Sequence, residues 1–329
     1  MNAKLKQHFP MIKNKEEIRN VIRINEKLES TFQRWTKSQQ EEFLNFTSGA
    51  TGIKMLYDSF FKEIMNPEYY PERMNDLLSE ILGVKVTIIH VLPTDSTRLG
   101  DETSLVTMDI VVQTEDGTLI NVEVQKIGYR FPGERSACYS ADLLLRQYKR
   151  IKDSYNSKAM FKYGDVKPVY TIVFFERSPE CFKAFPDKFV HRFMQVSDTG
   201  MELELLQRYV FIPLDIFKEM GKNINTKLEA WLTFLGSDDV EDILYLIEKY
   251  PEFKPMYQTL YEMCMNIEGV MNMFSEELRE LDRNTVLFMV DEYQKEVQEK
   301  DAKIEEQDAK IEEQAAIIAS LRAQLSKKV

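Results

Sequence analysis

The chain has 329 residues, of which 43% are hydrophobic and 11% aromatic, so it can build a large core and has the composition of a globular protein. Its net charge of −11 excludes a uniformly basic nucleic-acid-binding protein, so any contact with nucleic acid must come from a local basic segment. No run of 18 apolar residues predicts a membrane span, and Cys138, Cys181 and Cys264 form no closely spaced pair of the kind that binds zinc. The first residues lack the apolar stretch of a signal peptide, so we expect a cytoplasmic protein without membrane contact.

The first eighty residues predict helices. Within 14–46, five apolar side chains recur on roughly one helical stripe: Ile18, Ile22, Leu28, Phe32 and Trp35. The segment FTSGATG at 46–52 predicts a loop. We expect an amphipathic helix over 53–65 and a third helix over 71–82, where Pro71 suits the first turn.

The middle of the chain changes to short segments rich in β-branched residues, which predict strands. We expect strands at 84–92, 105–113, 119–125 and 168–176, with a long helix at 129–155 between the last two. The order of helix, three strands, helix and strand predicts a mixed α/β core.

Two acids and one amide stand out in the predicted hairpin MDIVVQTEDGTLINVEVQ, residues 108–125. Glu123 and Gln125 lie two residues apart on one strand and therefore share a face. Asp109 lies opposite Glu123 if the connection is the three-residue loop Glu115–Asp116–Gly117, a type I turn followed by a left-handed glycine, or if a bulge elsewhere shifts the register. A two-residue loop would send the two acids to opposite faces of the sheet.

If the two acids meet, their charges repel, and a divalent cation between them relieves the repulsion. Mg²⁺ is the expected ion because it prefers oxygen ligands and keeps several waters, and the carbonyl of Val124 offers a further oxygen. A water acidified by the ion can attack a phosphodiester, with Gln125 placed to hold that water or the phosphate. The hairpin therefore predicts a metal-dependent site for phosphodiester hydrolysis.

The pattern of an Asp, about fourteen residues and then Glu-x-Gln on the next strand resembles the PD-(D/E)XK nuclease superfamily. With DSFFKEIM, RSACYSADLLLRQY and PVYTIVFF, the chain looks like the recombination-promoting nuclease and transposase branch over roughly residues 53–235. The resemblance implies an α/β, restriction-endonuclease-like mixed sheet core flanked by helices. It also implies a metal-dependent DNA endonuclease linked to recombination, transposition or defence against phage.

The resemblance further implies roles for individual residues. Asp109 and Glu123 would bind Mg²⁺, with Mn²⁺ or Ca²⁺ as alternatives, and Gln125 would complete the catalytic set. The wider superfamily more often has a lysine there, and an amide cannot carry its positive charge. Many members add an acid from the first helix: Glu80 is the expected metal ligand and Asp58 its rival. The alternative function is a non-catalytic nucleic-acid-binding or regulatory protein on a degenerate nuclease fold.

A basic segment follows the hairpin, because residues 126–167 hold ten lysines or arginines and four acids. The predicted nucleic-acid contacts on its helix are Arg135, Tyr139, Arg146 and Lys149, with Asp142 on the same stripe. A second stripe is expected to face the core: Ala137, Ala141, Leu144, Tyr148 and Ile151. A solvated charged face is the competing interpretation.

The tail repeats DAKIEEQ without change at 301–307 and 308–314. Apolar residues recur every seven positions: Val297, Ile304, Ile311, Ile318 and Leu325. Lys303 and Asp308 fall at positions that pair between two parallel helices, which predicts a homodimer through a parallel coiled coil, although glutamine in the seam weakens it. The alternative is a solvated single helix.

These patterns divide the chain into four segments. We expect a helical N-terminal extension at 1–52 and a nuclease-like core at 53–185. A mostly helical region at 186–290 and a coiled coil at 291–329 follow.

Overall fold

The computed structural model describes residues 3–94, 108–126, 132–155, 161–221 and 224–281, with single residues and short runs between 289 and 314. The chain divides into two compact units, Met1–Leu281 and Asp282–Val329. Among the described residues, no helix combines the length and the apolar character needed to cross a bilayer.

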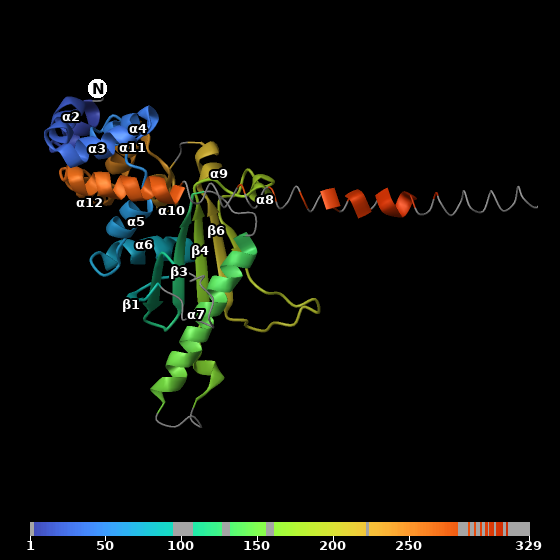
Figure 1. Ribbon diagram of the computed structural model, residues 1–329. Coiled ribbons are helices and arrows are strands. Elements are labelled where there is room, and N and C mark those ends of the chain that lie inside the picture. Colours follow the sequence, from blue (N-terminus) through green and yellow to red (C-terminus); the bar gives the residue numbers. More distant parts are fainter. Residues whose placement is uncertain are drawn as a thin grey trace, which may run out of the picture. The chain divides into compact units, whose positions relative to one another are not determined.

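The centre of the first unit is a six-stranded mixed sheet (Figure 1). Its spatial order is β1 (Ile88–Leu92), β2 (Ile110–Thr114), β3 (Leu119–Gln125), β4 (Val169–Phe175), β6 (Gln207–Pro213) and β5 (His191–Phe193). The strands β1, β2 and β3 are antiparallel, β3, β4 and β6 are parallel, and β5 runs antiparallel to β6. The predicted α/β fold with a restriction-endonuclease-like mixed sheet is confirmed.

One face of the sheet is covered by α7 (Pro132–Ser154), which joins the parallel strands β3 and β4 (Figure 1). A small apolar cluster lies under the helix and includes Val111, Leu119, Tyr139 and Leu143. Parallel neighbours need such a crossover because their ends lie at opposite edges of the sheet.

The opposite face packs against the main core and carries the other half of each alternating strand, such as Ile120 and Val122 of β3. The helices α5 (Asp58–Ile64) and α6 (Pro71–Leu82) contribute to this core. The predicted helix at 71–82 is confirmed: it starts at Pro71 and ends before Gly83, whose φ of +71° suits a helix terminus.

The predicted helical stretch at 14–46 consists of separate helices, because capping residues interrupt it. Asn25 caps one helix through its side chain, and Thr36 caps the next with Gln39 in a capping box. The helices before the sheet are α1 (Ala3–His8), α2 (Lys15–Ile24), α3 (Glu26–Arg34) and α4 (Lys37–Thr47).

The part of the first unit that follows β6 is helical. Its elements are α9 (Leu214–Glu219), α10 (Lys227–Gly236), α11 (Val240–Lys249), α12 (Lys254–Met263), and a helix from 267 described to 281. The short helix α8 (Glu180–Lys183) lies between β4 and β5 in the chain. Two short 3-10 helices are η2 (Tyr163–Asp165) and η3 (Pro251–Phe253). The rings of Trp35 and Phe274 meet edge to face at 5.0 Å, so the first and last helices of this unit share one core.

A buried ion pair ties the end of β3 to the helix that starts at residue 267. Lys126 pairs with Glu277, and their side chains are 8% and 3% exposed. Glu277 also accepts a hydrogen bond of 2.9 Å from the backbone N–H of Asp58, the first residue of α5. The carboxyl end of β3 and the start of α5 are therefore held to the same side chain.

In the second unit, the described residues between 289 and 314 are helical. Val297, Ile304 and Ile311 are 55%, 54% and 61% exposed. Ile318 and Leu325 of the predicted coiled coil lie outside the described residues.

Candidate active site

The hairpin has the register of the three-residue loop, one of the alternatives that the sequence left open. Ile110 pairs with Val122 and Gln113 with Leu119, so the same register places Asp109 opposite Glu123. Thr114 and Thr118 close a loop of three residues through a backbone bond of 3.0 Å, and Gly117 has a φ of +89°. The left-handed glycine after a turn is what a three-residue connection needs.

Side-chain hydrogen bonds lock this loop. The carboxylate of Asp116 accepts from the hydroxyl of Thr114 at 2.5 Å and from the backbone N–H of Thr118 at 3.1 Å. These bonds lower the pKa of Asp116, the hydroxyl of Thr114 having the largest effect. The turn chemistry therefore fixes which face of the sheet the two acids share.

Asp109 and Glu123 meet at the carboxyl end of β3. The backbone N–H of Asp109 donates to Oε1 of Glu123 at 3.3 Å, and the backbone N–H of Val124 donates to Oδ2 of Asp109 at 2.7 Å. Glu123 is 3% exposed, and the side chain of Asp109 is 17% exposed. The two acids therefore form one hydrogen-bonded unit, with Asp109 nearer to solvent.

The environment of Glu123 favours its protonated form. Burial, followed by the nearby charge of Asp109, raises the pKa of Glu123 from 4.5 to about 8, although Asn121 donates to its carboxylate at 2.9 Å. Burial also raises the pKa of Asp109. Two buried acids with raised pKa values are typical of a functional site.

Gln125 supplies an amide that is buried without a partner. Its side chain is on the same face as Glu123 and 4% exposed, and neither its oxygen nor its nitrogen forms a hydrogen bond with any described residue. The Oδ1 atom of Asn121 is likewise unpartnered within this part of the chain. Such groups cost free energy unless water, an ion or a substrate bonds them.

A lysine on α5 lies beside the two acids. The ammonium of Lys62 is 3.4 Å from Oδ1 of Asp109 and 3.0 Å from the carboxylate of Asp58. Burial by itself lowers the pKa of Lys62, but the charges of Asp109 and Asp58 outweigh it and the pKa is raised. Lys62 is therefore charged. The sequence prediction did not include it, although DSFFK places a lysine four residues after an acid on a helix, where the two side chains meet.

The two rival helix acids lie in different places. Asp58 shares Lys62 with Asp109, and its charge contributes to the raised pKa of Asp109. Glu80 lies one turn after Asp76 on α6, and Asp76 bonds Lys227 and Trp231 of α10. No described contact joins Glu80 to Asp109 or Glu123. The geometry therefore favours Asp58 over Glu80 as the helix acid of this site.

The oxygen atoms at this point suit a divalent cation. Gln125 directs its carbonyl to Glu176, beyond β4, so the alternation of the strand turns the carbonyl of Val124 to the side of Asp109. No group of three or more His, Cys, Asp or Glu side chains surrounds one point in the described ranges. Two carboxylates, one carbonyl and an unpartnered amide match the few protein ligands that Mg²⁺ takes when it keeps its waters.

The face of α7 toward the sheet differs from the predicted one. Tyr139, placed on the nucleic-acid stripe, is 5% exposed, and its hydroxyl accepts from Arg135 at 2.7 Å. Ala137 and Ala141, placed on the core stripe, are exposed. The prediction of these stripes is wrong because the helix buries small polar residues, including Ser136 and Ser140, against the sheet.

The basic residues of α7 separate into bonded and exposed ones. Arg146 donates to the carbonyl of Pro93 at 2.9 Å and pairs with Asp142 at 2.9 Å, so it holds the chain before β2 in place. Lys149 is exposed. Of the predicted nucleic-acid contacts, Lys149 keeps an open position, whereas Tyr139 and Arg146 have structural contacts.

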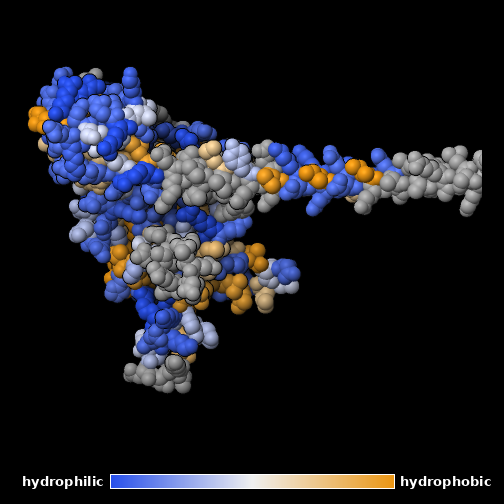
Figure 2. All heavy atoms as spheres, viewed as in Figure 1, coloured by the Kyte–Doolittle hydropathy of each residue, from blue (hydrophilic) through white to orange (hydrophobic). Residues whose placement is uncertain are grey.

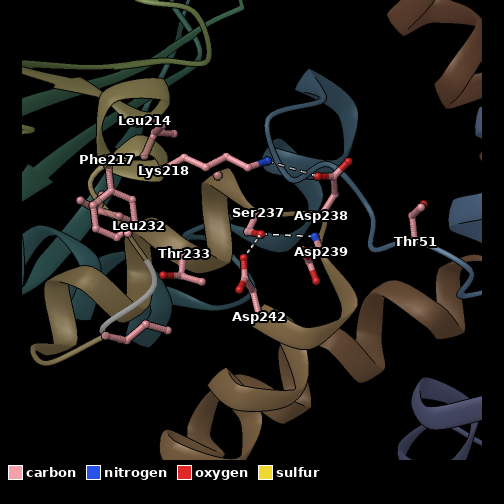
Figure 3. Close-up of a pocket in the computed structure, with 13 residues that line it drawn as sticks. Thr51, Leu214, Phe217, Lys218, Leu232, Thr233, Ser237, Asp238, Asp239 and Asp242 are labelled. Carbon is pink, nitrogen blue, oxygen red and sulfur yellow. Dashed lines mark hydrogen bonds and ion pairs between the residues drawn. The ribbon is translucent and has the colours of Figure 1, made fainter. Parts of the chain in front are cut away.

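A cavity of about 410 Å³ lies elsewhere, between α9, α10 and α11 (Figure 3). Its polar groups bond one another: Ser237 donates to Asp242 at 2.6 Å, and Lys218 is 3.6 Å from Asp238. The hairpin acids do not line this cavity. The candidate active site at the carboxyl end of β3 is therefore separate from this pocket.

A family model described as PD-(D/E)XK nuclease family transposase matches residues 55–289. The match includes the sheet, α5, α7 and the helices after β6. No curated protein and no solved structure matches the chain.

Proposed function

The chain belongs to the PD-(D/E)XK nuclease transposase family, and we propose that it is a metal-dependent DNA endonuclease with its active site at Asp109, Glu123 and Gln125. The observation that carries the proposal is the meeting of the two buried acids across the hairpin, beside an unpartnered amide. Phosphodiester hydrolysis needs a group of this kind, because negative charge on the phosphate must be offset and a water must be activated.

Asp109, Glu123 and the carbonyl of Val124 would hold Mg²⁺, with Mn²⁺ or Ca²⁺ as alternative ions. The bound ion would supply an acidified water and offset charge on the phosphate. Glu123 would lose its proton on loading, because a carboxyl must be ionised to ligate well. Gln125 can accept from a water and donate to a phosphate oxygen through the same amide, which orients the two reactants.

Lys62 supports the proposal by supplying a charge that Gln125 lacks. Its ammonium is at hydrogen-bonding range of Asp58 and 3.4 Å from Asp109, at the edge where a phosphate would approach. We infer that Lys62 balances the acids without metal and faces the phosphate when the acids hold an ion. An ammonium there can stabilise charge in the transition state.

The C-terminal tail supports a dimer within the same proposal. Val297, Ile304 and Ile311 are spaced by seven residues and exposed on helical residues, so a second copy could bury them in a parallel coiled coil. Two active sites in one dimer would suit cleavage of both DNA strands.

The alternative function is a non-catalytic nucleic-acid-binding or regulatory protein. It is favoured by Gln125 at a position where the superfamily more often has lysine, and by the cation that Lys62 already provides to Asp109. The two functions differ in one respect: only the endonuclease requires both acids.

The test is cleavage of supercoiled plasmid by the full chain with Mg²⁺, Mn²⁺ or Ca²⁺, compared with Asp109→Ala and Glu123→Ala. Loss of cleavage in both variants is expected, at 100-fold or more, on the order of what a group that stabilises transition-state charge contributes. Glu115→Ala is the matched control, because Glu115 is an exposed acid of the same hairpin. Cleavage that survives both substitutions contradicts the proposed site.

A further inference from the structure

An exposed aromatic group lies at the carboxyl end of α7, away from the acids. The rings of Tyr148 and Tyr163 are stacked, with centroids 6.1 Å apart and planes 14° apart. Phe161 meets both rings edge to face, at 5.2 Å from Tyr148 and 5.1 Å from Tyr163. Tyr163 is 77% exposed, so the face of its ring turned away from Tyr148 is open to solvent.

Basic residues lie next to these aromatic residues in the chain, and one of them contacts a ring. Lys149, Arg150, Lys162 and Lys167 are exposed, and the ammonium of Lys152 lies 5.1 Å from the centre of the Tyr148 ring. We call these basic residues, with Tyr148, Phe161 and Tyr163, the tip surface.

The tip surface is positive within an acidic chain. Two acids lie within the described residues 148–155 and 161–167, Asp153 and Asp165, and Asp165 accepts from the hydroxyl of Tyr155 at 2.5 Å. The chain as a whole has a net charge of −11. In Figure 2 the projecting end of α7 is hydrophilic, so its rings stand among charged groups and not in an apolar patch. A protein partner that needs a large apolar contact is therefore disfavoured.

The helix α7 connects the tip surface with the candidate active site, because Tyr148 lies in its last part and residues near its start lie close to Glu123. Near the start of the helix, Arg135 interacts electrostatically with Glu123, and the charge of Glu123 acts on Tyr139. Tyr148 follows Tyr139 by nine residues, which corresponds to roughly 13 to 14 Å along a helix. That is less than one turn of B-DNA, about 34 Å, so a short nucleic acid can span both places.

We propose that the tip surface binds single-stranded DNA, with a base stacked on Tyr163 and phosphates bound by the neighbouring lysines and Arg150. This inference rests on the proposed function, which makes DNA the substrate. It adds that the DNA is single-stranded and that it binds at the tip surface. A base inside a duplex already stacks on its neighbours, so only an unpaired base can lie on Tyr163 and continue the stack with Tyr148. The lysines read only the phosphates, so little sequence preference follows.

The test is binding of a fluorescent single-stranded oligonucleotide of twelve thymidines to the full chain in EDTA, measured by anisotropy. Tyr163→Ala is expected to weaken binding by about 5- to 100-fold, because stacking of one base contributes about 1 to 3 kcal/mol. Tyr163→Phe keeps the ring and should bind within about twofold of wild type. Tyr245→Ala is the matched control, since Tyr245 is 43% exposed on α11 with Lys249 beside its ring at 5.5 Å.

The salt dependence of binding tests the contribution of the positive charges of the tip surface. Lys162→Gln and Lys149→Gln should each reduce the slope of log affinity against log salt by about 0.7, the value for one phosphate contact on a single strand. Binding by Tyr163→Ala equal to that of Tyr245→Ala overturns the proposal, and so does a blunt duplex of twelve pairs that binds as tightly as the single strand.

This experiment does not depend on cleavage. A chain that binds single strands through Tyr163 but cuts no DNA would refute the endonuclease and keep the tip surface. A chain that cuts DNA through Asp109 and Glu123, with unchanged binding in Tyr163→Ala, would do the reverse.

Discussion

Glu123→Gln should stabilise the metal-free protein in a pH-dependent manner. The fold holds a carboxyl that is 3% exposed and raises its pKa from 4.5 to about 8. The protonated form is therefore favoured in the folded state, and the folded state loses stability as the pH rises from about 4.5 to about 8. Glutamine is uncharged at every pH and keeps an oxygen that can accept from Asn121.

The expected magnitude follows from the pKa. At about 1.4 kcal/mol for each pKa unit, ionised Glu123 costs the fold about 5 kcal/mol at pH 9 as an upper limit, because Lys62 and solvent near Asp109 relieve part of it. Glu123→Gln should therefore raise the free energy of unfolding by about 1 to 5 kcal/mol at pH 9 and change it little at pH 4.5.

The assay is urea denaturation in EDTA across this pH range, followed by the fluorescence of Trp35 and Trp231, which are 9% and 2% exposed. Glu115→Gln is the control for removal of an acid from the exposed side of the hairpin. A saturating divalent ion should make wild type more stable than Glu123→Gln. At 100 times its dissociation constant the ion stabilises wild type by about 3 kcal/mol, and the amide introduced at position 123 binds the ion less well than the carboxylate does. An equal effect of Glu123→Gln at pH 4.5 and pH 9 would refute the reasoning.

Two further substitutions test the scaffold of the site, both by urea denaturation. Lys126→Met leaves the carboxylate of Glu277 buried without its charged partner and should lower the free energy of unfolding by about 3 to 5 kcal/mol. Lys4→Met removes an exposed ion pair and should lower it by less than about 1 kcal/mol, so similar losses in the two variants would contradict the role of the buried pair. Gly117→Ala places a side chain at a φ of +89° and 3.1 Å from Lys167, and should lower the free energy of unfolding by about 1 to 2 kcal/mol. The control Gly133→Ala meets open space in α7 and should leave stability unchanged or raise it. If Gly117→Ala also left stability unchanged, the left-handed turn would not explain the register.

The hairpin is the part of the site that local chemistry determines. Asp116 accepts hydrogen bonds from Thr114 and Thr118, and Gly117 takes a conformation that other residues avoid, so local contacts stabilise the three-residue loop. Once the loop length is known, the alternation of side chains places Asp109 and Glu123 on one face. The limits of α6 follow in the same way from Pro71 and Gly83.

The face of α7 could not be predicted from its pattern. Its buried side is made of Ser136, Ser140 and Gln147 with Tyr139 and Leu143, so polarity alone does not separate inside from outside. Gln147 is buried because it accepts from the backbone of Lys167, a contact twenty residues away. The segment that packs against the helix decides which of its polar side chains form hydrogen bonds, and the helix pattern does not show which segment that is.

The sequence by itself determined the two strands of the hairpin and which loop lengths would pair the two acids, because turns and strand alternation act between near neighbours in the chain. Only the tertiary structure placed Lys62 of α5 beside Asp109 and buried Tyr139 while leaving Tyr163 exposed. These positions depend on how helices distant in sequence pack on the sheet, and burial and charge at a site are properties of that packing.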